Sequence, residues 1–591
     1  MKYRSEIDGL RALAVMPVIL FHAGFELFSG GFVGVDIFFV ISGYLITTIL
    51  VAEIENQQFS LISFYERRAR RILPALFFVM LISIPFAWFW MLPDPFENFG
   101  QSLVGSSLFS NNILLIMTSG DYWGLEAEYK PLLHTWSLAV EEQYYILFPI
   151  FLILFWHLGR VNVFWIIVIL AILSLSLSEW GWRNVEDANF FLSPMRIWEL
   201  LAGSIAAFIA EKRGVQNNNL PAFLGLFAIV FSIIAYDETV PFPSVYSLVP
   251  VLGTVLLVLY AGKDTFVAKL LSTKAFVGIG LISYSMYLWH QPVLAFLKIY
   301  LKSPPNDFAN YAVIFLTVIL AIGTWRFVEQ PFRQKGKFSS KFILRYSLVM
   351  IFSFVTLGMY IDRSNGIPER IFSDGSYKRN SHEIKITPTR LVIFDDVFSN
   401  IGKTNRVLIF GDSFAVDVAY LIEHKHPSLS YELIKSRKPQ DTVCQMELWK
   451  NASSLNISSI IFAYDEGFDI SCIETTIETL KASQIDILFV GTKQFGSNLN
   501  WIARTNFDER KLLCQPPITE KIKIDSRDQI SIPSPHYYSF INEFSEAGCF
   551  PISNLYGEIL SSDRYHFTVA GVEFFADSFF KNQNVKRVLD L

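Results

Sequence analysis

The sequence predicts a multi-span α-helical membrane bundle followed by a soluble α/β domain. Of its 591 residues, 52% are hydrophobic and only 17% are charged, and the mean hydropathy is positive. An average soluble protein has about 25% charged residues. Apolar residues are concentrated before about residue 361, whereas residues 362–591 have an ordinary globular composition and are long enough for one domain. We therefore expect at least two domains, the first of them in a lipid bilayer.

The first part contains repeated apolar stretches of about the length that spans a bilayer. We identify about eleven of them, at residues 10–25, 32–52, 73–92, 138–157, 163–178, 195–210, 220–236, 245–261, 281–300, 311–329 and 342–361. Segment 100–117 is a further candidate, but asparagines and serines interrupt it, and we expect a re-entrant or interfacial helix there. The first stretch has a basic start but no small-residue cleavage site after its apolar core, so we interpret it as a retained helix.

The basic residues favour one orientation of these spans. With about eleven spans and a cytoplasmic N-terminus, nearly every basic cluster, including ERRARR and RQKGKFSSK, falls in a cytoplasmic loop. If 100–117 also crossed the bilayer, every later basic loop would move to the outer side. An odd number of spans places the C-terminal domain outside. The net charge of −5, without a basic stripe, gives no reason to expect a nucleic-acid partner.

The cysteines favour the same orientation. All four, Cys444, Cys472, Cys514 and Cys549, lie in the C-terminal domain. Their even number and their absence from the membrane part favour disulfides in an oxidising compartment, with ordinary buried thiols as the alternative. Four cysteines allow three pairings, and the sequence does not choose among them.

The segment RALAVMPVILFH places Arg11 and His22 in one apolar helix. At about 100° per residue they lie on the same face, separated along the axis by about 16 Å. A charged residue at mid-bilayer costs about 2.5–3.5 kcal/mol, so this face is expected to look into protein or a water-filled cavity. The alternative is that Arg11 reaches the interface and His22 ends the helix at the other side.

The segment ERRARR precedes the third apolar stretch and contains Arg68 and Arg71. Residues three apart on a helix are neighbours, so these two side chains can present two guanidinium groups to one anion. The planar geometry of arginine suits phosphate, and a phosphorylated donor in the cytoplasm is one candidate ligand. The alternative is that these arginines only set the topology.

Further polar residues recur at the edges of later spans. They are His134, Trp136, Ser137, Glu141, Glu142, Gln143, Arg196, Trp198, Glu199, Ser283, Tyr284, His290, Glu329 and Arg333. Ionisable groups in several membrane helices are costly, and we expect them to surround one cavity. A proton-coupled transporter would have a similar set, so this pattern indicates a polar chamber without naming a reaction.

These motifs resemble the bacterial acyltransferase 3 family of integral membrane proteins. The resemblance rests on Arg11 and His22, on Arg68 and Arg71, and on HTWSLAVEEQ, SYSMYLWH and VEQPFR, in order across residues 3–333. It implies a cytoplasmic acyl-CoA donor, usually acetyl-CoA, and a glycan acceptor outside the cytoplasm. It also assigns the paired arginines to the CoA phosphates and makes His22 the essential histidine, with Arg11 as its partner. Whether His22 acts as a base or carries the acyl group is left open.

The C-terminal domain alternates short apolar strands with helices or loops, as in a parallel sheet covered on both faces. In RVLIFGDSFAVDVAYL, Ser413 directly follows a strand and opens a helix, where backbone N–H groups can stabilise an oxyanion. Asp563 and His566 lie three residues apart near the C-terminus, and such an aspartate can orient a histidine base. A simple strand-to-helix turn is the alternative for Gly-Asp-Ser alone.

This combination resembles the SGNH (GDSL-like) hydrolases, and their fusion to an acyltransferase 3 module resembles O-antigen and peptidoglycan O-acetyltransferases. The resemblance makes Ser413 the nucleophile, His566 the base and Asp563 its orienting acid, in an α/β/α fold. The chain departs from the Gly-x-Asn-Asp block of that family, since FAYDEGFD follows the third strand. Asn498 after the fourth strand is a candidate second oxyanion donor, beside the N–H of Ser413, or only shapes its loop.

The predicted domains are a membrane domain at 1–335, an additional transmembrane helix at 336–361, a polar linking region at 362–404 and the SGNH-like domain at 405–591. We predict a protein of the bacterial inner membrane with a cytoplasmic N-terminus and a periplasmic C-terminal domain. Its expected partners are the bilayer and a cell-surface or lipid-linked glycan, O-antigen or lipopolysaccharide being favoured. No metal is expected, because the histidines lack clustered ligand spacing.

The predicted activity is transfer of an acetyl group from acetyl-CoA to a glycan hydroxyl, completed by the C-terminal domain through an acyl-Ser413 intermediate. A covalent relay suits a donor bound inside and an acceptor held outside, because they cannot share one site. Two alternatives are an exporter of a modified glycan with an outer binding domain and an esterase that removes acetyl groups.

Overall fold

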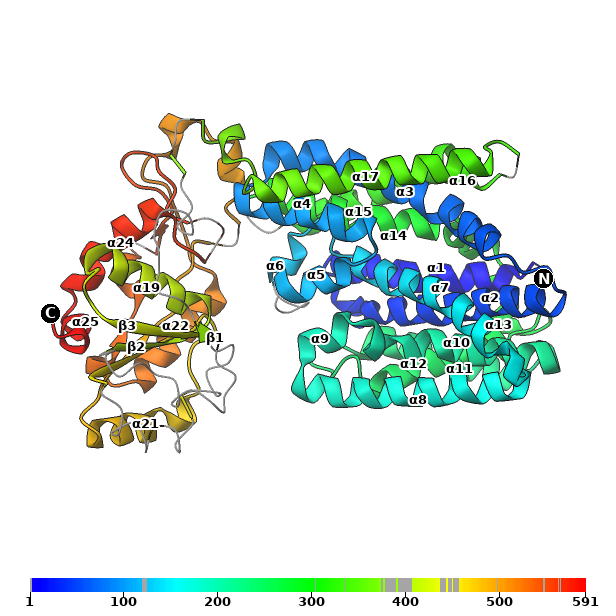
Figure 1. Cartoon of the computed structure of the whole chain (residues 1–591), viewed down its shortest axis with the longest axis horizontal. Coiled ribbons are helices and arrows are strands. Elements are labelled where there is room, and N and C mark those ends of the chain that lie inside the picture. The colour runs from blue at the N-terminus through cyan, green and yellow to red at the C-terminus, as the bar shows by residue number, and fades with distance from the viewer. Residues whose placement is uncertain are drawn as a thin grey trace. The chain divides into compact units, whose positions relative to one another are not determined.

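The computed structural model divides the chain into two compact units, and each is described by itself (Figure 1). The membrane unit comprises Met1–Phe89 and Pro95–Gly366, and the C-terminal unit comprises Trp90–Asp94 and Ile367–Leu591. The residues that the structure describes are 3–118, 125–302, 305–334, 336–373, 376–377, 390–391, 407–435, 443–444, 449, 457–496, 498–545, 548–561, 563 and 565–591.

Each predicted apolar stretch falls largely within a helix of the membrane unit. These helices are α1 (Ser5–His22), α2 (Gly34–Glu55), α3 (Leu61–Trp90), α7 (Thr135–Phe155), α8 (Arg160–Asn184), α10 (Ser193–Arg213), α11 (Asn219–Ala235), α12 (Leu248–Tyr260), α14 (Lys274–Tyr300), α15 (Asp307–Thr324) and α17 (Ser340–Arg363). Among the described residues, seven helices are long and apolar enough to cross a membrane, and two shorter apolar helices occur at 219–235 and 245–260. The other two, α1 and α14, carry Arg11, His22 and His290.

Segment 100–117 forms two short helices, α4 (Pro93–Ser107) and α5 (Asn111–Thr118). The chain breaks at Phe109, which has a φ of +53°. The buried side chain of Asn111 donates hydrogen bonds to the Leu132 carbonyl at 3.0 Å and to Thr135 Oγ1 at 2.8 Å. Asn111, one of the polar residues that interrupt the apolar pattern, therefore binds the start of α7 and the residues just before it. Neither helix is long enough to span a bilayer.

Close helix packing in this unit depends on glycine. Gly43 of α2 and Gly203 of α10 lie against the backbone of the facing helix, where a Cβ atom would collide with Leu200 and Val40 respectively. Small residues at such crossings allow membrane helices to approach closely. α1 contacts both α2 and α14, and α2 contacts α7, so these four helices position the residues described below.

The C-terminal unit is built on a six-stranded sheet, among its described residues, in which every neighbouring pair is parallel. Its order is β1 (Arg390–Leu391), β3 (Tyr431–Lys435), β2 (Val407–Gly411), β4 (Ser459–Ala463), β5 (Asp486–Val490) and β7 (Tyr537–Tyr538). A separate antiparallel pair joins β6 (Cys514–Gln515) and β8 (Phe550–Pro551).

Both faces of the sheet are buried, as the apolar runs predict. Ile409 and Ile461 pack on one face with α19 (Ser413–Lys425) and α24 (Val569–Lys581). Leu408 and Ile460 pack on the other face with α21 (Ile470–Ala482). The remaining helices are α22 (Thr519–Ser531), α23 (Phe540–Phe544) and α25 (Gln583–Leu589). The predicted parallel α/β sheet is therefore confirmed.

The four cysteines form two disulfides, Cys444–Cys472 and Cys514–Cys549. The sequence alone left this pairing open. The predicted linking region at 362–404 lies mostly outside the described residues. Its described N-terminal part completes α17 and continues into a short 3-10 helix, Pro368–Arg370.

Candidate active site

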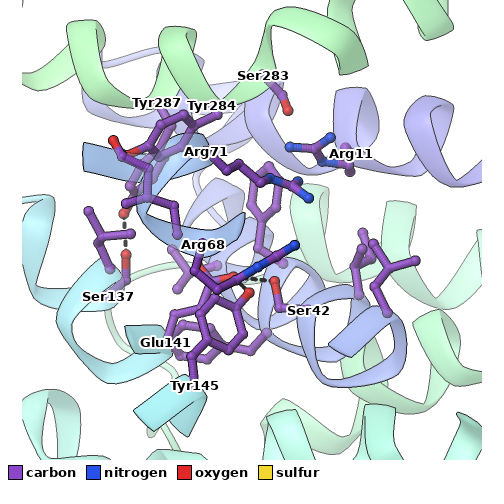
Figure 2. A pocket seen from close by; sticks show the side chains of 17 residues that line it. Arg11, Ser42, Arg68, Arg71, Ser137, Glu141, Tyr145, Ser283, Tyr284 and Tyr287 are labelled. Carbon is purple, nitrogen blue, oxygen red and sulfur yellow. Dashed lines mark hydrogen bonds between the residues drawn. The ribbon is translucent and has the colours of Figure 1, made fainter. Parts of the chain in front are cut away.

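A pocket lies among helices α1, α2, α3, α7 and α14 of the membrane unit (Figure 2). Its polar lining residues are Arg11, Ser42, Arg68, Arg71, Ser137, Glu141, Tyr145, Ser283, Tyr284 and Tyr287. Figure 2 shows the guanidinium groups of Arg11, Arg68 and Arg71 extending into this space from two helices. Arg11 and Arg71 are close enough to repel one another electrostatically. Such a concentration of positive charge suits an anionic ligand.

The four arginines of the segment ERRARR divide into two pairs with different surroundings. Arg67 binds both carboxylate oxygens of Glu53, at 2.8 and 2.9 Å, and Arg70 forms an ion pair with Glu66 at 2.6 Å. Arg68 and Arg71 line the pocket, and among the described residues neither has a carboxylate within ion-pair distance. Both pairs have a spacing of three residues, and it is the contacts in the structure that separate the pocket arginines, Arg68 and Arg71, from those paired with glutamates.

Glu141 is the carboxylate that lines the pocket, and it is already engaged. It accepts hydrogen bonds from Ser42 of α2 and from Tyr145 of its own helix. Across the pocket, Ser137 and Tyr287 share a hydrogen bond of 2.6 Å. These contacts tie α7 to α2 and α14, so they fix the walls of the pocket.

Three histidines meet beside this pocket, although they come from distant parts of the sequence. The ring centroids of His22 and His290 are 5.2 Å apart, and those of His134 and His290 are 5.4 Å apart. Tyr287 packs against His134 and His290 and also lines the pocket, so it connects the two features. No group of His, Cys, Asp or Glu in the described part of the chain is arranged to hold a metal ion.

The hydrogen bonds of two of these histidines define their tautomers. His22 Nδ1 contacts the Val18 carbonyl at 2.9 Å, and His290 Nδ1 contacts the Tyr287 carbonyl. A carbonyl only accepts hydrogen bonds, so each Nδ1 carries the hydrogen and Nε2 is the basic nitrogen of the neutral ring. Both ring nitrogens of buried His134, and Nε2 of His290, have no hydrogen-bond partner among the described residues.

The expectation of one cavity surrounded by all the polar residues needs correction. Ser137, Glu141, Ser283 and Tyr284 line the pocket. The fully buried Arg196 and Glu199, however, form a separate cluster with Asp36, in which Arg196 lies 3.3 Å from Asp36 and 3.2 Å from Glu199. Aromatic rings surround this arginine, and one of them, that of Phe39, also lines the pocket. Glu329 is likewise engaged elsewhere, with Arg333 at 2.8 Å and with Ser285.

In the C-terminal unit, Ser413 is the first residue of α19, and only Asp412 separates it from the end of β2, close to the predicted position. Asp412 caps this helix, because its Oδ1 accepts the N–H of Phe414 at 2.8 Å. Its Oδ2 accepts the N–H of Asp465, which follows β4, at 2.9 Å. Burial raises the pKa of Asp412 to about 6. The Asp412 carboxylate therefore attaches the loop before Ser413 to the segment that follows the neighbouring strand, β4.

Asp563 and His566 form a hydrogen-bonded pair. His566 Nδ1 lies 2.6 Å from Asp563 Oδ2, and Asp563 Oδ1 accepts the N–H groups of Tyr565 and His566. Burial alone would lower the pKa of His566, but the Asp563 carboxylate raises it to about 9. Burial alone would raise the pKa of Asp563, but the charge and hydrogen bond of His566 hold it well below its usual value. Asp563 thus orients the imidazole with Nε2 facing away from the pair.

The chain segments that carry Ser413 and His566 are in contact. The ring of Phe414 packs against that of Tyr565, with centroids 6.4 Å apart, and the N–H of Phe567 donates to Asp417 Oδ1 at 3.3 Å. No hydrogen bond joins Ser413 to His566 themselves in the part of the chain that the structure describes. Bonds between a nucleophile and its base are often longer without substrate.

Asn498, the candidate second oxyanion donor, is engaged in other contacts. Asn498 Oδ1 accepts the backbone N–H of Asn500 at 2.8 Å and its side-chain amide at 3.2 Å, so this oxygen shapes the loop. Asp465, in the block that departs from the SGNH pattern, pairs with Lys521 at 2.8 Å and accepts a bond from Thr492 at 3.1 Å. The donor role of Asn498 stays a prediction.

Comparison with known families tests the interpretation of the membrane unit. Residues 4–326 match the acyltransferase 3 family, described as an acyltransferase domain, and this region is more than half of the chain. The chain belongs to the acyltransferase 3 family. No solved structure shows significant similarity to it.

Two relatives of this acyltransferase 3 protein come from Staphylococcus aureus. O-acetyltransferase OatA is 31% identical over 352 residues, which cover 57% of this chain and 58% of OatA. A second protein, named only provisionally as an O-acetyltransferase, is 29% identical over 458 residues, or 71% of this chain and 75% of its own length. The match to OatA therefore extends over little more than half of either protein.

The sequence analysis expects His134 and His290 among the polar residues around a cavity but gives them no catalytic role, and it does not single out Tyr287. HTWS and SYSMYLWH were recognised as motifs, but their histidines were not assigned to the site of His22. The cost of an ionisable group in a membrane helix predicts that these histidines face a shared interior, but it does not predict which of them meet.

Proposed function

We propose that this acyltransferase 3 protein is a membrane O-acetyltransferase that transfers an acetyl group from cytoplasmic acetyl-CoA to a hydroxyl of a cell-surface glycan outside the cytoplasm. O-antigen or lipopolysaccharide is the favoured acceptor. The protein would lie in a bacterial inner membrane, with its C-terminal unit in the periplasm. The names of the two relatives support O-acetyl transfer, and the two disulfides support an oxidising compartment for the C-terminal unit.

The observation that carries the proposal is the convergence of Arg11, Arg68 and Arg71 in a pocket beside the histidine cluster. Arg68 and Arg71 have no carboxylate within ion-pair distance among the described residues, so their guanidinium groups suit the phosphates of a CoA donor. Arg11 lies 3.7 Å from Asp8 and adds positive charge to the same space. Nε2 of His22 would serve as the base, or as the acyl acceptor, at the thioester. Arg11 and His22 belong to the same helix, so donor binding and chemistry share one rigid element.

In the C-terminal unit, Ser413 would complete the transfer. Its Oγ attacks the carbonyl carbon of the incoming acyl group while His566 Nε2 takes the hydroxyl proton, and His566 then gives that proton to the leaving group. The acceptor hydroxyl next attacks the acyl-serine ester, loses its proton to His566, and Ser413 recovers it. The N–H groups at the start of α19 would stabilise the oxyanion in both steps.

The test compares glycan acetylation in cells that express the wild type, His22→Ala or Ser413→Ala at matched membrane levels, with released sugars analysed by mass spectrometry. Loss of acetylation in both variants supports a relay through both units. Loss with His22→Ala alone leaves the membrane unit as the transferase. Increased acetylation with Ser413→Ala identifies an esterase, and normal acetylation in both variants contradicts the enzyme and favours an exporter.

A further inference from the structure

A buried ion pair lies next to the proposed nucleophile in the C-terminal unit. Lys493 Nζ is 2.7 Å from Asp417 Oδ2, and the two side chains are 1% and 3% exposed. Asp417 belongs to α19, one helical turn after Ser413, and Lys493 follows β5. None of the sequence patterns singled out either residue.

The stability of the fold does not explain this pair. Moving two charges out of water costs several kcal/mol for each ion, and well-packed apolar residues of similar size often replace such a pair without loss of stability. The ammonium group also lies 3.5 Å from the centre of the Phe414 ring and 4.8 Å from that of Phe567. These contacts attract a cation, but they would be equally available to an apolar side chain.

The contacts of the pair are instead concentrated around the two proposed catalytic residues. Phe414 and Phe567, which hold the Lys493 ammonium between them, directly follow Ser413 and His566 in the sequence. Asp417 Oδ1 also accepts the N–H of Phe567 at 3.3 Å. The pair therefore joins three elements: the helix that begins at the nucleophile, the segment that carries the base, and the loop after β5.

We propose that Asp417 and Lys493 are positioning residues that set the distance and orientation between Ser413 and His566 during acyl transfer. This inference rests on the proposed role of Ser413 as the nucleophile. A fixed separation matters because a small displacement of reacting groups, of about 1 Å, can reduce a rate by about 100-fold.

The pair also has an electrostatic signature at His566. The charged groups that act on this imidazole, among the described residues, are Asp563 on its own loop, Asp417 on α19 and Lys493 after β5. Asp417 raises the pKa of His566, whereas Lys493 lowers it. Removal of Asp417 should therefore lower the pH midpoint of Ser413 labelling, and removal of Lys493 should raise it.

The test measures how fast a fluorophosphonate probe labels Ser413 in the full-length protein in detergent, between pH 5 and pH 10. Variants are Asp417→Asn and Lys493→Met. The matched control is Asp577→Asn, which removes the partner of Lys425 in an exposed ion pair between α24 and the same helix α19. We expect each test variant to be labelled at least 10-fold more slowly, and the control to match the wild type. The pH midpoint should fall in Asp417→Asn and rise in Lys493→Met.

The outcomes separate this inference from the function on which it rests. If the wild type is not labelled, or Ser413→Ala is labelled equally, the nucleophile itself is wrong. If Ser413 is labelled but the test variants react at the wild-type rate, the positioning role is overturned. It is also overturned if slower labelling only follows a loss of folded protein, measured by thermal unfolding, with no shift of the pH midpoint. Lys493→Arg, which keeps the charge, should recover most of the rate.

Discussion

His22 of α1 and His290 of α14 face each other with ring centroids 5.2 Å apart. Each of these rings donates its Nδ1 hydrogen to a carbonyl of its own helix, which leaves Nε2 as the basic nitrogen of the neutral ring. His290 is fully buried and has no partner at Nε2 among the described residues. Because burying an unpaired polar atom is costly, His290 is expected to act on substrate together with His22.

We therefore predict that His290→Ala lowers glycan acetylation by at least 10-fold, while the protein still reaches the membrane. The variant removes the imidazole that lies beside His22, and the hydrogen bond that it loses is to a carbonyl of its own helix. His157 provides the control, since its Nδ1 makes the same type of bond to a carbonyl three residues earlier, but at an exposed position. Equal acetylation in His290→Ala and His157→Ala, measured by mass spectrometry of released sugars, would contradict this role.

The pocket arginines should control affinity for the donor. Arg68→Lys and Arg71→Lys keep the charge but lose the planar pair of donors, and we expect each to raise the KM for acetyl-CoA about 10-fold, with a smaller change in kcat. Arg67→Lys is the control from the same turn, because Arg67 is paired with Glu53 outside the pocket. The measurement is acetyl transfer in inverted membrane vesicles with acetyl-CoA added outside. An equal rise in KM for all three variants would contradict the division between pocket and structural arginines.

Local sequence patterns predicted the elements, but not the contacts between distant ones. The strand before Ser413 and the helix after it are encoded by adjacent residues, and so is the spacing of Asp563 and His566. By contrast, the meeting of His22, His134 and His290 depends on how three helix regions pack. The ion pair of Lys493 was invisible because lysine is normally a surface residue, and a single sequence gives no sign of its burial.

The pH dependence of Ser413 acylation should report the protonation of His566. Since the pKa of His566 is raised to about 9, its imidazole is protonated at neutral pH and becomes the base as the pH rises. We expect the rate of labelling by a fluorophosphonate to increase from pH 6 to about pH 9. Asp563→Asn removes the charge that raises this pKa, so its midpoint should move toward the ordinary value of about 6.5, with a lower maximal rate because the imidazole is no longer oriented. A midpoint that is unchanged in Asp563→Asn would show that another group limits the reaction.

The two disulfides should differ in their effect on the site. In the chain-entropy account, closing loops of 28 and 35 residues stabilises the fold by similar amounts, about 3.5–4 kcal/mol. Their positions are different, however. Cys514–Cys549 joins β6 to the residue directly before β8, and Gln515 of β6 packs against Gly496 in the loop after β5 that also contains Lys493. Cys444–Cys472 joins the start of α21 to a segment packed on the opposite face of the sheet from α19.

We therefore expect replacement of both Cys514 and Cys549 by serine to slow labelling of Ser413 more than replacement of both Cys444 and Cys472. Both double variants should lower the denaturant midpoint of the C-terminal unit in the full-length protein by similar amounts. Labelling rates are compared for the folded fraction at equal protein concentration. Similar slowing in both variants would contradict this prediction. It would mean that the disulfides affect labelling of Ser413 only through the stability of the whole unit, and not through the position of the loop that contains Lys493.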